Sequence, residues 1–146
     1  MFRRIASAFF GAALLLPGAE GRVQAEVFRG PVQAEVIAVL DGDTFLANAH
    51  VWPGQFVRVN VRVRGMDAPE IHSRCPAEKR AALRARAALE ELVGGGPVSI
   101  SNIGGAKYYG RVLADVETAD GMPVTEIMLA RHLARPYSGG RRRPWC

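Results

Sequence analysis

Alternation of apolar and polar residues is clearest in the predicted strand Gln55–Arg64, where valines at 57, 59, 61 and 63 alternate with arginine or asparagine at 58, 60, 62 and 64. A period of two is typical of a strand with one buried face. β-Branched residues dominate Val32–Leu40, which we also expect to be a strand. Thr44–Val51 is a third expected strand, and the turn at Asp41–Asp43 precedes it.

Helical spacing follows at Pro76–Val93. Proline suits the first turn of a helix, and three glycines at 94–96 end this one. The stripe expected to face the core comprises four residues: Ala82, Ala85, Leu89 and Leu92. Pro123–Arg131 predicts a second, short helix.

Two more strands are predicted at Pro97–Ile103 and Arg111–Glu117. Five strands with a helix between the third and the fourth is the order of an OB-type barrel. We therefore predict an α+β, mainly β fold: a five-stranded OB-fold barrel with two flanking helices. Such barrels often bind oligonucleotides, but a fold alone does not define function.

The first 25 residues have the pattern of an export signal. Two arginines precede the apolar stretch Ile5–Leu16, which is too short to span a bilayer comfortably. Cleavage after Ala25, or after Ala19, would leave one folded domain, residues 26–146 for the first site. We expect a periplasmic or secreted protein without a membrane anchor, and a monomer. An uncleaved anchor or a buried N-terminal helix is the alternative.

The chain is moderately basic. The 146 residues carry 19 Lys and Arg against 14 Asp and Glu, a net charge of +5. Loss of three arginines and one glutamate with the signal lowers it to +3. This balance favours polyanionic partners without proving them. Hydrophobic residues make up 49% of the chain, an ordinary globular value that argues against wholesale disorder.

The chain has two cysteines, Cys75 and Cys146. In an oxidising compartment an even pair predicts a disulfide. Closing a loop of this size stabilises a fold by about 4 kcal/mol in the chain-entropy model. The link would also hold Trp145 and the basic tail Arg141–Arg143 against the body. The alternative is a reactive thiol at Cys75, ahead of the proline that starts the helix.

Three short segments concentrate chemistry: Asp41–Thr44 (DGDT), Arg62–Glu70 (RVRGMDAPE) and Tyr109–Arg111 (YGR). Each alone is an ordinary turn or loop. Asp43 and Asp67 lie near the ends of predicted strands that can be neighbours in a barrel. Their carboxylate oxygens would then form a site suited to Ca²⁺ or Mg²⁺.

Three further side chains of these segments fit phosphate chemistry. Glu70 is placed to hold or deprotonate a water beside such a metal. Arg62 and Arg111 provide the guanidinium groups that a phosphoryl transition state needs. The three histidines, His50, His72 and His132, do not have zinc-ligand spacing.

These segments, in this order, resemble the staphylococcal nuclease (thermonuclease) family over about Val32–Tyr137. The resemblance implies an OB barrel and a Ca²⁺-dependent nuclease that hydrolyses phosphodiesters of single-stranded DNA or RNA to 3′-phosphates. It implies Asp43, Asp67 and the Ala68 carbonyl as metal ligands, with Asp41 as their support.

The same resemblance assigns Glu70 as the general base and Arg62 and Arg111 as the phosphate-binding and catalytic pair. Lys107, Tyr108 and Tyr109 would contact the nucleotide, and Tyr137 is the one tyrosine available after the second helix. A non-catalytic OB module that binds nucleic acid or protein is the alternative, and an exported structural protein is a third possibility.

Two positions depart from the family pattern. Ala68 replaces a threonine, so a hydroxyl contact to the pocket is lost while a backbone ligand is kept. His132 stands where the family commonly has glycine. A left-handed backbone is expected there, at a cost of roughly 1 kcal/mol.

Overall fold

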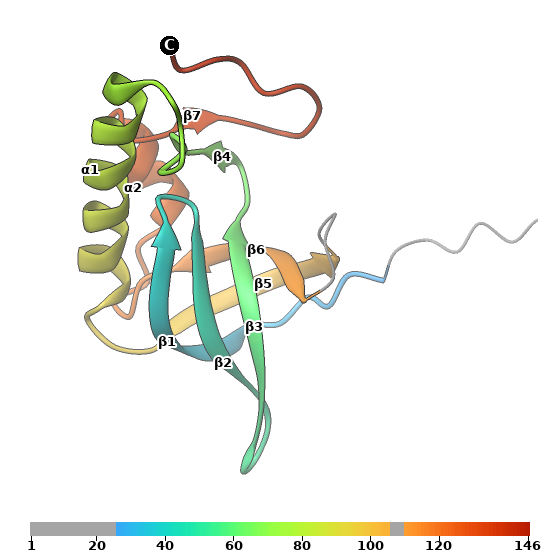
Figure 1. Ribbon diagram of the computed structural model, residues 1–146. Helices are drawn as coiled ribbons and strands as arrows, with labels where there is room; N and C mark the ends of the chain where they lie inside the picture. The colour runs from blue at the N-terminus through green and yellow to red at the C-terminus, as the bar shows by residue number, and fades with distance from the viewer. Residues whose placement is uncertain (1–25, 106–109) are drawn as a thin grey trace, which may run out of the picture.

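Figure 1 shows the computed structural model of the chain, which describes residues 26–105 and 110–146. The elements, in chain order, are β1 Val32–Asp41, β2 Thr44–Trp52, β3 Gln55–Val63, β4 Met66–Asp67, α1 Pro76–Val93, β5 Val98–Gly105, β6 Arg111–Glu117, α2 Val124–Ala130 and β7 Arg135–Pro136. The predicted signal segment, residues 1–25, lies outside the described residues.

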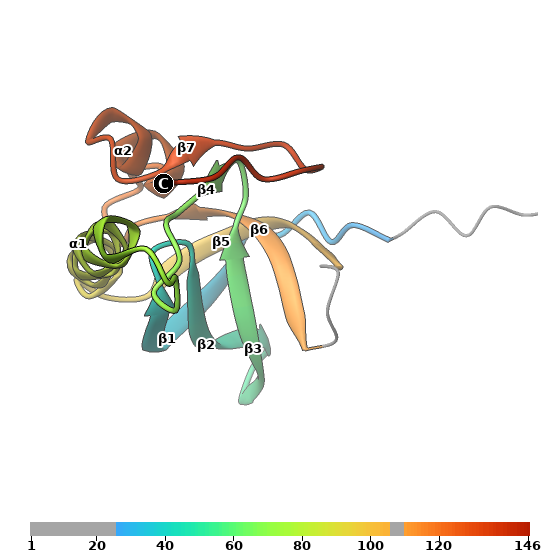
Figure 2. The same ribbon diagram turned by 45° about the horizontal axis from the view of Figure 1, so that its top comes forward.

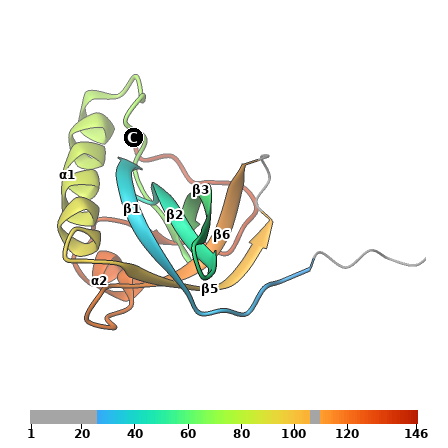
Figure 3. The same cartoon turned by 90° about the horizontal axis from the view of Figure 1, so that it is seen from below.

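Five strands close into a barrel in the order β1-β2-β3-β6-β5, and β5 returns to pair with β1. All neighbours are antiparallel except β3 and β6, which run parallel. The view from below shows the strands around the barrel and α1 outside it, beside β1 (Figure 3). This arrangement confirms the predicted fold class, a five-stranded OB barrel with two helices.

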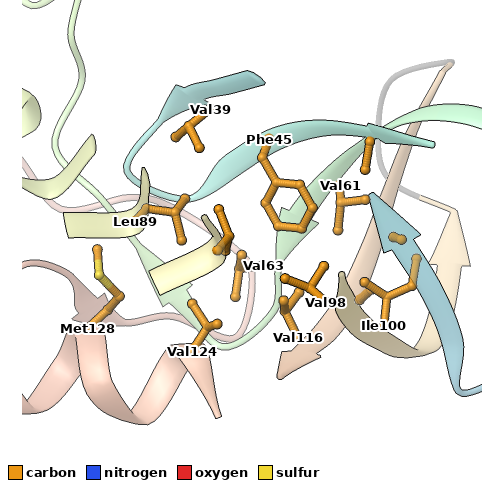
Figure 4. Packing of buried hydrophobic residues seen from close by; sticks show 14 of the residues in the cluster. Val39, Phe45, Val61, Val63, Leu89, Val98, Ile100, Val116, Val124 and Met128 are labelled. Atoms are coloured by element: carbon orange, nitrogen blue, oxygen red, sulfur yellow. The ribbon is translucent and has the colours of Figure 1, made fainter. Parts of the chain in front are cut away.

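The core fills the barrel and continues under both helices (Figure 4). Val61 and Val63, on the valine face of β3, are fully buried, whereas Val57 near the start of the strand is 51% exposed. Burial of each large apolar side chain contributes about 2 kcal/mol. Figure 4 labels the other main contributors: Val39, Phe45, Leu89, Val98, Ile100, Val116, Val124 and Met128.

Helix α1 has the bounds that the sequence predicts, Pro76–Val93. Its buried residues differ from the expected stripe by one position: Val93 is buried, and Leu92 is only partly buried. Val93, the last residue of α1, thus joins the core cluster. Met128 and Val124 give α2 its buried side.

A small two-stranded sheet outside the barrel is absent from the sequence prediction. β4 pairs antiparallel with β7, with Asp67 opposite Arg135. Figure 2 shows this sheet beside the C-terminal segment, over one end of the barrel. His132, between α2 and β7, has φ of 56°, the left-handed conformation expected there.

Cys75 and Cys146 form a disulfide, with their Cα atoms 6.5 Å apart. That separation is normal for this bond. Cys75 immediately precedes α1, so the bond joins the C-terminal segment to the start of that helix (Figure 1). In the part of the chain described, no helix has the length and apolar character needed to cross a bilayer.

Candidate active site

Asp43 is held in the turn between β1 and β2 by hydrogen bonds to both carboxylate oxygens. The backbone N–H of Ala68 donates to Oδ2 at 2.9 Å, and the hydroxyl of Thr44 donates to Oδ1 at 2.9 Å. Asp41 accepts the N–H of Asp43 through Oδ1 at 3.1 Å. Asp43 is buried, so these contacts fix both its position and its orientation.

Close packing at Gly42 explains how this turn reaches the loop after β4. A Cβ atom at Gly42 would lie 2.7 Å from Cβ of Ala85 in α1 and 2.8 Å from Cβ of Ala68. Only glycine fits between these two alanines without displacement of the backbone. The glycine of the DGDT segment therefore brings Asp43 against Ala68.

Arg62 connects the two buried carboxylates. Its Nη1 lies 2.9 Å from Oδ1 of Asp43, and its Nη2 lies 3.3 Å from Oδ1 of Asp67. Arg62 pairs with Thr44 across the β2–β3 ladder, which sets its side chain beside the Asp43 turn. The structure thus brings together three of the predicted residues, which lie up to 24 positions apart in sequence.

Burial raises the pKa of Asp43 to about 6, and the neighbouring Asp41 carboxyl adds to the rise. The positive charge of Arg62 and the N–H of Ala68 act in the opposite direction. A carboxyl group with such a pKa is poorly solvated, and a second cation beside it would favour its ionised form. A further positive charge beside Asp43 would therefore be favourable.

Glu70 lies at the edge of this cluster with its side chain half exposed. The loop that carries it is held by Glu78 of α1, which accepts the hydroxyl of Ser73 at 2.5 Å and the N–H of Glu70 at 3.0 Å. Those two hydrogen bonds lower the pKa of Glu78. The start of α1 thus positions the loop beside the acidic pair.

The cluster opens into a cleft of about 680 Å³. Arg111 of β6 lines it, and so does Tyr137, whose ring centre is 5.9 Å from the Arg62 guanidinium carbon. The cleft is also lined by Asp41, Asp43, Thr44, Arg62, Arg64, Ala68, Pro69, Glu70, Gly139, Gly140 and Arg142. It is large enough for a nucleotide-sized ligand.

Arg64 lines the same cleft but is held by other partners. Its guanidinium contacts Asp115 at 3.0 Å and donates to the carbonyl oxygens of Asn102 at 2.6 Å and Leu113 at 3.1 Å. Arg64 therefore links the end of β3 to β5 and β6, whereas Arg62, two residues earlier, forms ion pairs with Asp43 and Asp67.

Arg142 of the C-terminal segment also enters the site, which the sequence analysis did not predict. Its Nε lies 2.6 Å from Oδ1 of Asp67, and its Nη2 donates to the Ala68 carbonyl at 3.1 Å. It also forms an ion pair with Glu70. The signal for this contact was the cysteine pair, because Cys75 closely follows Glu70 and Cys146 closely follows Arg142.

Lys107, Tyr108 and Tyr109, the predicted nucleotide contacts, lie outside the described residues. Within residues 26–105 and 110–146, no group of three or more His, Cys, Asp or Glu side chains is placed to hold a metal. The oxygen donors that the structure gathers are two carboxylates, Asp43 and Asp67, and the Ala68 carbonyl.

These three donors fit a hard divalent cation that completes its coordination with water or phosphate oxygens. The Arg142 guanidinium already contacts two of them, Asp67 and the Ala68 carbonyl, as a positively charged stand-in. The third is Asp43, whose burial raises its pKa and so favours an added positive charge beside it.

The fold and the site together define an OB-barrel protein with a cleft in which buried acids and arginines meet. The profile of the family described as Staphylococcal nuclease homologue matches residues 60–143, more than half of the chain. The chain belongs to this family, as the sequence segments indicate. A search of curated proteins found no match.

The matched region runs from β3 to the C-terminal segment and so contains Arg62, Asp67, Glu70 and Arg111. Asp43 lies before it. Its place in the site rests on the contacts with Ala68 and Arg62 described above.

Proposed function

We propose that the protein is a calcium-dependent nuclease that hydrolyses phosphodiester bonds of single-stranded DNA or RNA and leaves 3′-phosphates. The family is one of nucleases and is typically calcium-dependent. The observation that carries the proposal is the double ion pair of Arg62 with Asp43 and Asp67 at the cleft. It joins a phosphate-binding group to the acids that suit a divalent cation.

Asp43, Asp67 and the Ala68 carbonyl hold the cation in this proposal. A bound divalent ion polarises a phosphate oxygen and lowers the pKa of water beside it. Arg62 and Arg111 donate hydrogen bonds to the non-bridging oxygens, and charge-assisted bonds of this kind strengthen as negative charge accumulates on the phosphate.

Glu70 accepts a proton from the attacking water, or orients that water, from its half-exposed place beside the acids. The water oxygen forms a bond to phosphorus, and the bond from phosphorus to the 5′-oxygen breaks. The 5′-oxygen takes up a proton from solvent water and leaves as a hydroxyl, and the phosphate stays on the 3′-oxygen.

A cleavage assay tests this proposal. The purified protein is incubated with denatured DNA in calcium and in excess chelator, alongside Glu70→Gln and the matched control Glu91→Gln. Glu91 is an exposed residue of α1. We expect cleavage by wild type and Glu91→Gln in calcium, little by Glu70→Gln, and none in chelator. Salt-sensitive DNA binding without cleavage would favour a non-catalytic binding module instead.

We also propose that the protein is exported, with residues 1–25 as a cleaved signal, and that it acts as a monomer. The disulfide supports export, because such bonds persist in oxidising compartments. Mass spectrometry of the non-reduced protein from its host tests the cleavage and the disulfide: a mature chain that starts near residue 26 and lacks two hydrogens is expected. An intact N-terminus or two free thiols would contradict the proposal.

A further inference from the structure

The C-terminal segment Tyr137–Cys146, here the strap, is fixed to the body at both ends. At its start, the N–H of Tyr137 donates to the Gly65 carbonyl at 3.0 Å. At its end, Cys146 is bonded to Cys75. The strap passes over β4 and β7, at the end of the barrel where the site lies (Figures 1 and 2).

Trp145 fixes the strap above the acidic pair. The Arg135 guanidinium carbon lies 3.6 Å from the centre of the Trp145 ring, and Arg135 donates to the Pro144 carbonyl at 2.9 Å. The indole N–H of Trp145 donates to Oδ2 of Asp67 at 3.4 Å. These contacts leave the strap little freedom to move away from Asp67.

Arg142 projects from the middle of this strap onto three groups at once: Asp67, the Ala68 carbonyl and Glu70. Burial disfavours the charged guanidinium, but the hydrogen bonds to Glu70 and Asp67 outweigh that effect and raise the pKa of Arg142. These three groups are among those assigned above to cation binding and to the attacking water, and the fourth is Asp43. The Arg142 side chain therefore contacts most of the groups to which the proposed function assigns a role.

We infer that Arg142 is an internal counter-ion of the metal site, held there by the disulfide-anchored strap, and that a divalent cation binds only by displacing it. The inference rests on the proposed function, because it needs the acids to be metal ligands. The Arg142 guanidinium and a divalent ion carry like charges and compete for the same oxygens of Asp67 and Ala68. Arg142 therefore lowers the calcium affinity of the site and delays its loading.

The effect follows from competition. Apparent affinity falls in proportion to the fraction of molecules in which the site is open. Charge-assisted hydrogen bonds of this kind are strong enough for about a tenfold difference between the arginine-covered and the uncovered site. A merely structural arginine would give the opposite result, since its loss would loosen the site and weaken metal binding.

Calorimetric titration of metal-free protein with calcium chloride tests the inference without using activity. The variants are Arg142→Gln, Arg142→Lys and the matched control Arg143→Gln, which removes an exposed charge one residue away. We expect Arg142→Gln to bind calcium about tenfold more tightly than wild type. Arg142→Lys should lie between them, because lysine keeps the charge without the planar fork. Arg143→Gln should match wild type.

A variant that lacks the disulfide anchoring the strap tests the inference in a second, independent way. In Cys75→Ser/Cys146→Ser, Arg142 is no longer held near the acids, so calcium affinity should rise toward that of Arg142→Gln. Unchanged or weaker binding by Arg142→Gln, while wild type binds calcium, would overturn the inference and leave the proposed function intact. Equal tightening in Arg143→Gln would also overturn it, since the effect would then be one of net charge. Absence of calcium binding in every variant would reject the proposed metal site together with the inference.

Discussion

The backbone N–H of Ala68 donates a hydrogen bond to Oδ2 of Asp43 at 2.9 Å, and it joins two segments that lie 25 residues apart. The bond fixes the β1–β2 turn against the loop after β4. Both parts are needed for the site, because one carries Asp43 and the other carries Asp67 and Glu70. The geometry of the acids therefore depends on how tightly these two segments pack.

Arg62→Ala tests the link between the acids. It should reduce cleavage of denatured DNA about 100-fold or more, because a donor to the transition state is lost. It should also lower the free energy of unfolding by up to about 3 kcal/mol in metal-free protein, since the buried Asp43 loses its ion-pair partner while Asp67 keeps Arg142. Urea denaturation and initial rates measure the two effects.

Arg86→Ala is the control for Arg62→Ala. Arg86 forms an exposed ion pair with Glu90 within α1, and such pairs contribute only about 0.3–0.5 kcal/mol. Equal stability losses in the two variants would contradict the proposed role of Arg62.

The pKa of Asp43, about 6, predicts how stability depends on pH in metal-free protein. Because this pKa is raised, the stabilising contribution of Asp43 is present below about pH 4 and is lost as the pH rises through 6. Wild type should lose up to about 1.4 kcal/mol per pH unit relative to Asp43→Asn across that window. Denaturation of both proteins in chelator at several pH values checks this. A difference that stays constant from pH 4 to pH 7 would be evidence against it.

Gly42→Ala tests the packing that sets the turn. The new methyl group would overlap Cβ of Ala85 and of Ala68, so we expect a loss of about 1–3 kcal/mol in stability and reduced cleavage. Gly95→Ala is the matched control, since nothing lies within 4 Å of a Cβ there. If Gly42→Ala proved as stable and active as Gly95→Ala, the turn would not be held by this contact.

Most of the barrel and α1 could be predicted from the sequence, because there the hydrophobic periodicity and the glycine and proline residues at the ends of the elements indicate the same bounds. Arg111–Glu117 and Pro76–Val93 have the predicted bounds, and the other barrel strands differ by two residues or fewer. β4 and β7 have two residues each, too few for any periodicity to show. Their pairing depends on the tertiary fold, which brings the two segments together.

The site was predictable where its residues lie in recognisable segments. Arg62 and Arg64 share a face of the strand predicted at Gln55–Arg64, yet Arg64, one residue past β3, pairs with Asp115 of β6 and not with the acids. Local pattern does not distinguish them, because the partner comes from another strand. Arg142 was missed for a similar reason: an arginine in a basic tail shows no periodic pattern, and its partners depend on how the disulfide-anchored strap packs.

The central claim is that Asp67 and its partners form a metal-dependent hydrolytic site. Calcium titration of the cleavage rate on single-stranded DNA, for wild type and Asp67→Asn, tests it most directly. We predict a saturable calcium dependence for wild type, and for Asp67→Asn a rate at least about 100-fold lower or a far higher calcium requirement. Cleavage by Asp67→Asn at the wild-type rate, or by either protein in excess chelator, would contradict the account.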